Sequence, residues 1–184
     1  MMEELQYPIG RYRIEHEITA ERRAELIAQI AILPSQLHGA VSGLDDAQLD
    51  TAYRPEGWTL RQVVHHVADS HMNAYVRMRL ALTEDEPAIA PYKEGYWAML
   101  PDALSAPPEL SLGLLEGLHA RWVLLLESLS DEQFARRFFH PQYGTRVRQD
   151  EILSHYAWHG QHHTAQLTGL RDRMGWQAAT RPLA

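Results

Sequence analysis

Four histidines fall within nine positions of the stretch HYAWHGQHHTAQ, residues 155–166. The stretch has the three-and-four spacing of an amphipathic helix, and His159 and His163 lie on its apolar side, one turn apart. Imidazoles at positions i and i+4 can present two nitrogens to one metal ion. The alternative is a pair of buried structural histidines bonded to the backbone. We favour a metal, because one cation satisfies both buried rings. We expect His155 and His162 to point elsewhere, as solvated or capping residues.

A metal site needs further ligands, and the chain contains no cysteine. The third ligand must therefore be His, Asp or Glu from another helix, and the stretch VVHHVADSH, residues 63–71, is the densest source. Helical periodicity alone favours His71, which lies in the middle of an apolar stripe, whereas His66 lies on a polar flank. Periodicity thus predicts His71 as the third ligand.

Composition limits the remaining possibilities. The chain has 184 residues, 45% of them hydrophobic, which is enough for one buried core and suits a single domain over residues 1–184. A net charge of −7 with scattered Lys and Arg disfavours nucleic acid and membrane partners. The absence of cysteine suits a reducing compartment, and the first residues, MMEELQYPIGRY, show no signal pattern. We therefore expect a cytoplasmic protein.

Four long segments show helical periodicity, and no segment alternates with period two for long enough to predict a sheet. The second begins most clearly: Thr59 and Gln62 form a capping box, and Trp58 and Val63 form a hydrophobic staple, so a helix should start at Leu60. Residues 83–95, TEDEPAIAPYKEG, then make a long connection. The pattern predicts an all-α four-helix bundle with an N-terminal extended arm and a long crossover. The four segments are residues 20–41, 60–82, 109–129 and 148–174.

Two details of these segments bear on the fold. Pro34 lies inside the first segment, so we expect a kink or break there. GLDDAQL at residues 43–49 and SLSDEQF at residues 128–134 share a pattern, and each precedes a loop and a histidine-bearing helix. This weak repeat indicates that the bundle consists of two related helix pairs.

Several motifs together resemble the YfiT branch of the DinB-like four-helix family. They are YPIGRY, GLDDAQL, GWTLRQVVHHVADSHMNAY, LHARW, FFHP and WHGQHHTAQL, and they extend over nearly the whole chain. The resemblance implies a metal-binding bundle with one ligand in a His-Val-Ala-Asp context and two in a His-x3-His-x2-Gln stretch. Carried over to this chain, the ligands are His66, His159 and His163, and Gln166 completes the second motif. The resemblance therefore replaces His71 with His66.

Three histidine ligands leave one position of a tetrahedral ion open, which is typical of a catalytic site. We expect one divalent ion per chain, zinc by default and nickel as an alternative. The resemblance implies a metal-dependent hydrolase or, alternatively, a transferase in which the metal activates a low-molecular-weight thiol of the bacillithiol type. A third hypothesis is a non-catalytic metal-binding bundle. No His-Glu-x-x-His glutamate marks a general base, so the catalytic residues stay unknown, with Glu56, Asp69 and Glu151 as candidates.

Other residues could complete a cleft. His119 lies on an apolar stripe and could support the metal site, whereas Trp122 is more typical of the core. Arg54 and Arg121 could hold a substrate carboxylate, although single arginines are usually solvated. The partner we expect is a small-molecule substrate. The connection APYKEGYWAMLPDAL, residues 90–104, is rich in aromatic and apolar residues, so it should cover a pocket or mediate a homodimer.

Overall fold

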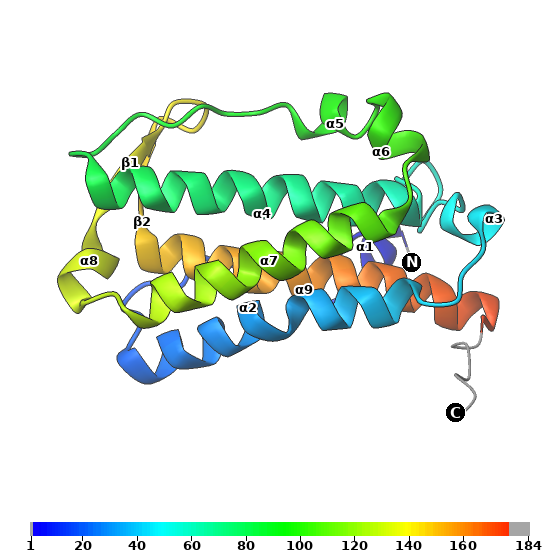
Figure 1. Cartoon of the computed structure of the whole chain (residues 1–184), viewed down its shortest axis with the longest axis horizontal. Coiled ribbons are helices and arrows are strands. Elements are labelled where there is room, and N and C mark those ends of the chain that lie inside the picture. The colour runs from blue at the N-terminus through cyan, green and yellow to red at the C-terminus, as the bar shows by residue number, and fades with distance from the viewer. Residues whose placement is uncertain (1, 177–184) are drawn as a thin grey trace.

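Four long helices form an elongated bundle in the computed structural model, which describes residues 2–176 (Figure 1). The protein is an all-α four-helix bundle, as predicted. The four helices are α2 (Ala20–Val41), α4 (Leu60–Thr83), α7 (Pro108–Glu127) and α9 (Gln149–Met174). Their bounds agree with the sequence prediction to within two residues. No helix of the described residues is long and apolar enough to cross a membrane.

Helices that follow one another in the sequence are not all neighbours in the bundle. Helix α2 packs against α7 and α9, and α4 packs against the same two helices, so α2 lies diagonally opposite α4. The long crossover runs back along α4, so α7 starts at the same end of the bundle as α4 and runs parallel to it (Figure 1). Helices α4 and α9 are antiparallel neighbours, and this places residues from both in one interface.

Local sequence signals explain where the helices begin and end. Thr59 accepts a hydrogen bond from the backbone N–H of Gln62, whose side chain bonds back to Thr59, so α4 starts at Leu60 as predicted. Gly175 ends α9 in a left-handed conformation with φ of 66°. The two repeated stretches each form a capping box that opens a short helix, α3 (Asp46–Leu49) and α8 (Asp131–Ala135).

The expected kink or break at Pro34 does not interrupt α2, which continues to Val41. Proline cannot donate the backbone hydrogen bond that would reach the carbonyl of Ile30, four residues earlier. That carbonyl instead accepts a hydrogen bond from the ring of His119 on α7 at 2.6 Å. The helix therefore tolerates the proline because a neighbouring helix supplies the missing donor.

A small hairpin is one of the short elements that the sequence did not predict. Strands β1 (Arg137–His140) and β2 (Thr145–Arg148) pair antiparallel, with Phe138 opposite Val147. Each strand has only four residues, too few for alternation to stand out. The hairpin lies beside the C-terminal end of α4 in Figure 1 and leads directly into α9.

The N-terminal arm is only partly extended. It begins with a short helix, α1 (Met2–Gln6), and residues 7–19 then run without helix or strand to α2. The crossover contains two short helices, α5 (Glu94–Trp97) and α6 (Pro101–Ser105). Both connections lie against the bundle: the side chain of Gln62 donates to the carbonyl of Ala98 at 2.7 Å, and Tyr12 packs on His155 of α9.

The core consists of two hydrophobic clusters separated by a layer of histidines. One cluster surrounds Trp122 and Phe138, and the other surrounds Leu37 and Val64. Between them, at the middle of the bundle, lie side chains from three of the long helices: His71 of α4, His119 of α7, and His159 and His163 of α9. The bundle is therefore polar where its helices would otherwise pack most tightly.

Candidate metal centre

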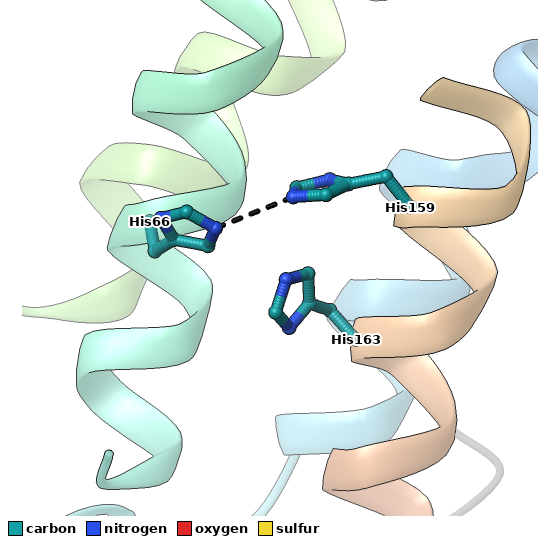
Figure 2. Close-up of side chains that lie close together, drawn as sticks. All are labelled: His66, His159 and His163. Carbon is teal, nitrogen blue, oxygen red and sulfur yellow. Dashed lines mark hydrogen bonds between the residues drawn. The ribbon is translucent and has the colours of Figure 1, made fainter. Parts of the chain in front are cut away.

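Three histidines from two antiparallel helices converge in this polar layer. His66 projects from α4, and His159 and His163 project from successive turns of α9 toward it (Figure 2). Each of the three offers one nitrogen, and these atoms all lie within 4.8 Å of one another. The Nε2 atoms of His66 and His159 are 3.3 Å apart, and the rings of His159 and His163 have centroids 4.5 Å apart.

All three rings are at least nine-tenths buried. Burial, with a smaller contribution from His162, lowers the pKa of His66 to about 4. Burial and then the neighbouring imidazoles lower the pKa of His159 and of His163 well below the usual value for histidine. The rings are therefore neutral at pH 7, and neutral imidazole is the form that binds a metal.

The hydrogen bonds of Gln166 determine which nitrogen of His163 carries the proton. The amide nitrogen of Gln166 donates to the carbonyl of Gln6 at 2.9 Å, so its oxygen faces His163. That oxygen can only accept, and it lies 2.8 Å from Nδ1 of His163. Nδ1 therefore carries the hydrogen, and Nε2 of His163 keeps its lone pair.

A chain of three histidines determines the tautomer of His159 in the same way. His119 must donate from Nδ1 to the carbonyl of Ile30, so its Nε2 accepts from Nδ1 of His71 at 3.1 Å. Nε2 of His71 then accepts from Nδ1 of His159 at 3.2 Å. This leaves Nε2 of His159 with a lone pair directed at His66. We call Ile30, His119, His71 and His159 the histidine relay.

The donor set therefore fits a divalent ion. Two of the three imidazoles have lone pairs fixed on the nitrogen that faces the shared centre, and the third, His66, lies within reach of both. Metal-bound histidines usually donate their second ring N–H to a carbonyl, carboxylate or other acceptor, as His159 and His163 do here. The structure places His71 behind His159, in contact with it, rather than among the three converging rings.

A cavity of about 670 Å³ opens beside two of these histidines. His66 and His159 form part of its wall, together with residues of the crossover, the β1–β2 hairpin and the N-terminal arm. Apolar side chains including Phe138, Val147 and Ile152 line much of the remainder. A cavity of this size suits a small molecule.

Comparison with known proteins identifies the family. The model of the DinB superfamily matches residues 29–167. The chain belongs to the DinB superfamily. It is 48% identical over 172 residues to "Putative metal-dependent hydrolase YfiT" of Bacillus subtilis (strain 168), covering 94% of this chain and 97% of that one. It is 51% identical over 175 residues to a "Putative metal-dependent hydrolase" of Bacillus cereus (strain 03BB102), covering 95% of this chain and all of that one.

A solved DinB structure is equally similar. The structure of YfiT from Bacillus subtilis superimposes with a TM-score of 0.93 at 48% identity, and the match covers 95% of this chain and 99% of that one. Its description attributes to it an unusual four-helix bundle topology. In this DinB protein, α2 and α4 lie diagonally opposite each other in the bundle.

The sequence prediction for His162 of this DinB protein was wrong, whereas His155 is only partly covered. His162 is buried, although it was expected to be solvated or capping. It stacks on Trp158 at 4.6 Å and accepts a hydrogen bond from Gln166. His155 lines the cavity and packs on Tyr12 at 4.7 Å. Both rings are covered to this extent because the N-terminal arm lies over α9, a tertiary contact that a helical wheel does not contain.

The other candidates fall into separate places. Trp122 is fully buried in the core, as expected, and His119 belongs to the histidine relay. Of the candidate bases, Glu151 lines the cavity, whereas Glu56 and Asp69 do not. Burial, and then Asp102, raises the pKa of Asp69 to about 6. Arg54 and Arg121 are also absent from the cavity wall.

Arg77 is among the cavity residues that sequence reasoning missed. It is eleven residues beyond His66 on α4, which places both on one helical face, and both line the cavity. The sequence signal was this spacing, but arginine on a helix is usually solvated, so spacing alone did not distinguish Arg77 from other arginines.

Proposed function

We propose that the protein is a metal-dependent enzyme, in the first place a hydrolase, in which His66, His159 and His163 bind one divalent ion. The observation that carries the proposal is the convergence of three buried, neutral imidazoles, two of which line a cavity. A bound zinc ion would act as a Lewis acid and lower the pKa of a coordinated water or thiol. The name of the Bacillus subtilis relative, metal-dependent hydrolase, supports the same reaction class.

The protein's own residues would hold and orient the reacting groups. Gln166 and the histidine relay hold the rings of His163 and His159 in the ligand tautomer. Ser70 and Tyr156 line the cavity next to His66 and His159, and their hydroxyl groups lie 3.4 Å apart. They can donate hydrogen bonds to a polar substrate.

One observation favours the alternative reaction, transfer to a low-molecular-weight thiol. Of the candidate bases only Glu151 lines the cavity, but its carboxylate accepts the backbone N–H of Arg148 and completes the helix cap. His155 also lines the cavity, but burial and then the charge of Arg77 lower its pKa to about 4, which makes it a weak base. A metal held by the three histidines would lower the pKa of a coordinated thiol, which could then lose its proton to solvent and would require neither group.

The experiment that tests the proposal is metal analysis of protein purified without a histidine tag. We expect one divalent ion per chain, zinc before nickel, and we expect its loss in His159→Ala and His163→Ala but not in His162→Ala. Turnover of ester substrates, and of electrophiles with thiols, should then depend on the metal and disappear on chelation. Stoichiometric metal without any metal-dependent turnover would support a non-catalytic metal-binding bundle instead. If His71→Ala loses the ion while His66→Ala keeps it, the ligand set is wrong.

We also propose that the protein is cytoplasmic and forms a homodimer through the crossover. Tyr96, Met99, Leu100 and Leu104 all lie in this connection with more than two-fifths of their surface exposed. Such a concentration of large apolar side chains is unusual on a monomer. Sedimentation of wild type and of a Tyr96→Ser, Leu100→Ser double variant tests it: the wild type should sediment as a dimer and the variant as a monomer.

A further inference from the structure

Arg77 is a buried arginine in the wall of the candidate active-site cavity. Its side chain has only 8% of its surface exposed. His66 and Arg77 are eleven residues apart on α4, which is about three helical turns, so their side chains project in the same direction. Both face the same cavity.

No carboxylate of the described residues forms an ion pair with this guanidinium. Its Nε has no hydrogen-bond partner in the protein, and Nη2 makes only a long hydrogen bond, 3.4 Å, to the carbonyl of Ala90. Arg61, also on α4 and equally buried, shows the usual arrangement: it pairs with Asp46 and Asp50, each at 2.7 Å. Buried charges are rarely left without such partners, because desolvation costs too much.

A second buried polar atom without a protein partner lies in the same cavity. Nδ1 of His140, on β1, has no hydrogen-bond partner, and the residue is 8% exposed. Burial and then the positive charge of Arg77 lower the pKa of His140. The ring of Tyr92 lies 5.8 Å from the guanidinium. Donors from two elements, α4 and β1, are thus available to one ligand.

We infer that Arg77 binds a carboxylate of the substrate, so that the substrate is a small molecule with a carboxylate at one end and its reacting group near the three histidines. The inference rests on the proposed function, since it takes the cavity beside those histidines as the substrate site. A carboxylate suits the site better than a phosphate, because one guanidinium balances one negative charge. The other arginine of the wall, Arg146, already pairs with Glu86.

The structure also sets the length of such a substrate. Eleven residues of helix correspond to about 16 Å along α4, and the long arginine side chain leans back toward the N-terminal end of the helix. The guanidinium is therefore on the order of 10 Å from the three histidines. Phe138, Val147 and Ile152 line the cavity, so the part of the molecule between the two ends should be largely apolar.

Binding of octanoate and of its neutral analogue octanamide to metal-free protein tests the inference by titration calorimetry. Octanoate should bind on the order of 10- to 100-fold more tightly than octanamide, because it gains a charge-assisted hydrogen bond. Arg77→Met should abolish this preference, and Arg146→Gln should retain it as a matched control on the same wall. The measurement needs no metal, so its failure is distinct from failure of the proposed metal site, which metal analysis detects.

Several results would overturn the inference. Equal binding of octanoate and octanamide to the wild type would do so, as would a preference that survives in Arg77→Met or disappears equally in Arg146→Gln. Tighter binding of octyl phosphate than of octanoate would overturn the assignment to a carboxylate. Thermal unfolding checks the variant itself: Arg77→Met should melt no lower than the wild type, because it removes an unpaired buried charge. A loss of melting temperature as large as that of Arg61→Met would show that Arg77 is structural.

Discussion

The ring of His119 donates its Nδ1 hydrogen to the carbonyl oxygen of Ile30, over a distance of 2.6 Å. Pro34 leaves this carbonyl without its helical partner, so the acceptor is free to bind a side chain. Every following hydrogen bond of the relay then has one direction, from His71 to His119 and from His159 to His71. The carbonyl that Pro34 leaves open in α2 thereby favours the tautomer in which Nε2 of His159, the nitrogen that faces His66, keeps its lone pair.

Breaking the relay should weaken metal binding without removing a ligand. In His119→Phe an aromatic ring of similar size fills the position, but both hydrogen bonds of His119 are lost. His71 then no longer holds His159 in one tautomer. Loss of such supporting hydrogen bonds typically costs about 10- to 100-fold in metal affinity. Competition with a chromogenic chelator measures the dissociation constant, and His119→Gln, which can both donate and accept, should restore part of the affinity.

His65→Phe is the matched control for this experiment. His65 is also a buried histidine, adjacent to His66 on α4, but it bonds to Ser111 and to the carbonyl of Ala106, away from the relay. Its replacement should lower stability and leave metal affinity unchanged. Equal loss of affinity in both variants would mean that general destabilisation, rather than the relay, controls the site.

Removal of the metal should destabilise the fold. The ion would join α4 to α9, so it binds the native state and adds about 1.4 kcal/mol of stability for each tenfold rise in free metal above its dissociation constant. For a chain of this size the melting temperature should rise by about 3–6 °C per tenfold. Thermal unfolding at buffered metal concentrations measures this dependence. A melting temperature that does not change with the free metal concentration would exclude a metal ion that joins α4 to α9.

The long helices were predictable because their signals are local. Apolar periodicity marked all four segments, and the capping box of Thr59 and Gln62 fixed one start to the residue. The β1–β2 hairpin was missed because its four-residue strands are too short to show a period. A break at Pro34 was expected as one possibility because the donor that satisfies Ile30 comes from His119, 89 residues away, and the sequence around the proline does not show it.

In the candidate site too, the features that depend on local sequence were predictable and those that depend on tertiary packing were not. The spacing of His159 and His163 is local, and the helical wheel placed both on one face. The wheel favoured His71, which lies in the middle of the apolar stripe, and the family resemblance replaced it with His66. Both residues are buried, and which of them faces α9 at the site depends on how the two helices pack. Their roles as ligands remain predictions. The environments of His162, His155 and Arg77 depend on the N-terminal arm, the crossover and the hairpin, which periodicity does not position.

On acidification, the metal-free protein should unfold at a higher pH than is usual for a bundle of this size. Burial lowers the pKa of His66, His155 and His162 to about 4, below that of histidine in the unfolded chain. The unfolded state therefore binds more protons, so the stability present above about pH 6.5 is lost as the pH falls toward 4. Each such histidine contributes about 1.4 kcal/mol per pH unit in this range.

Urea unfolding at a series of pH values measures this slope, and His162→Gln provides the control. Glutamine can still accept the hydrogen bond from Gln166, but it does not titrate. The variant should therefore lose about 1.4 kcal/mol per pH unit from the slope between pH 6 and 5. A slope unchanged from the wild type would show that His162 is solvated in the native protein, as its sequence position had suggested.

Gly160 should resist substitution, because it brings α9 close to α2. It lies between the two candidate ligands of α9, and a Cβ placed there would meet the side chain of Leu33 well inside van der Waals contact. Leu33 is 2% exposed and cannot move away without disturbing the core. Gly160→Ala should therefore destabilise the protein by about 1–3 kcal/mol through overpacking.

Gly117 of α7 has open space around its Cβ position, so Gly117→Ala should stabilise by about 0.5–1 kcal/mol through helix propensity. Urea midpoints of the two variants decide the matter: a Gly160→Ala protein as stable as Gly117→Ala would mean that α9 and α2 do not approach this closely.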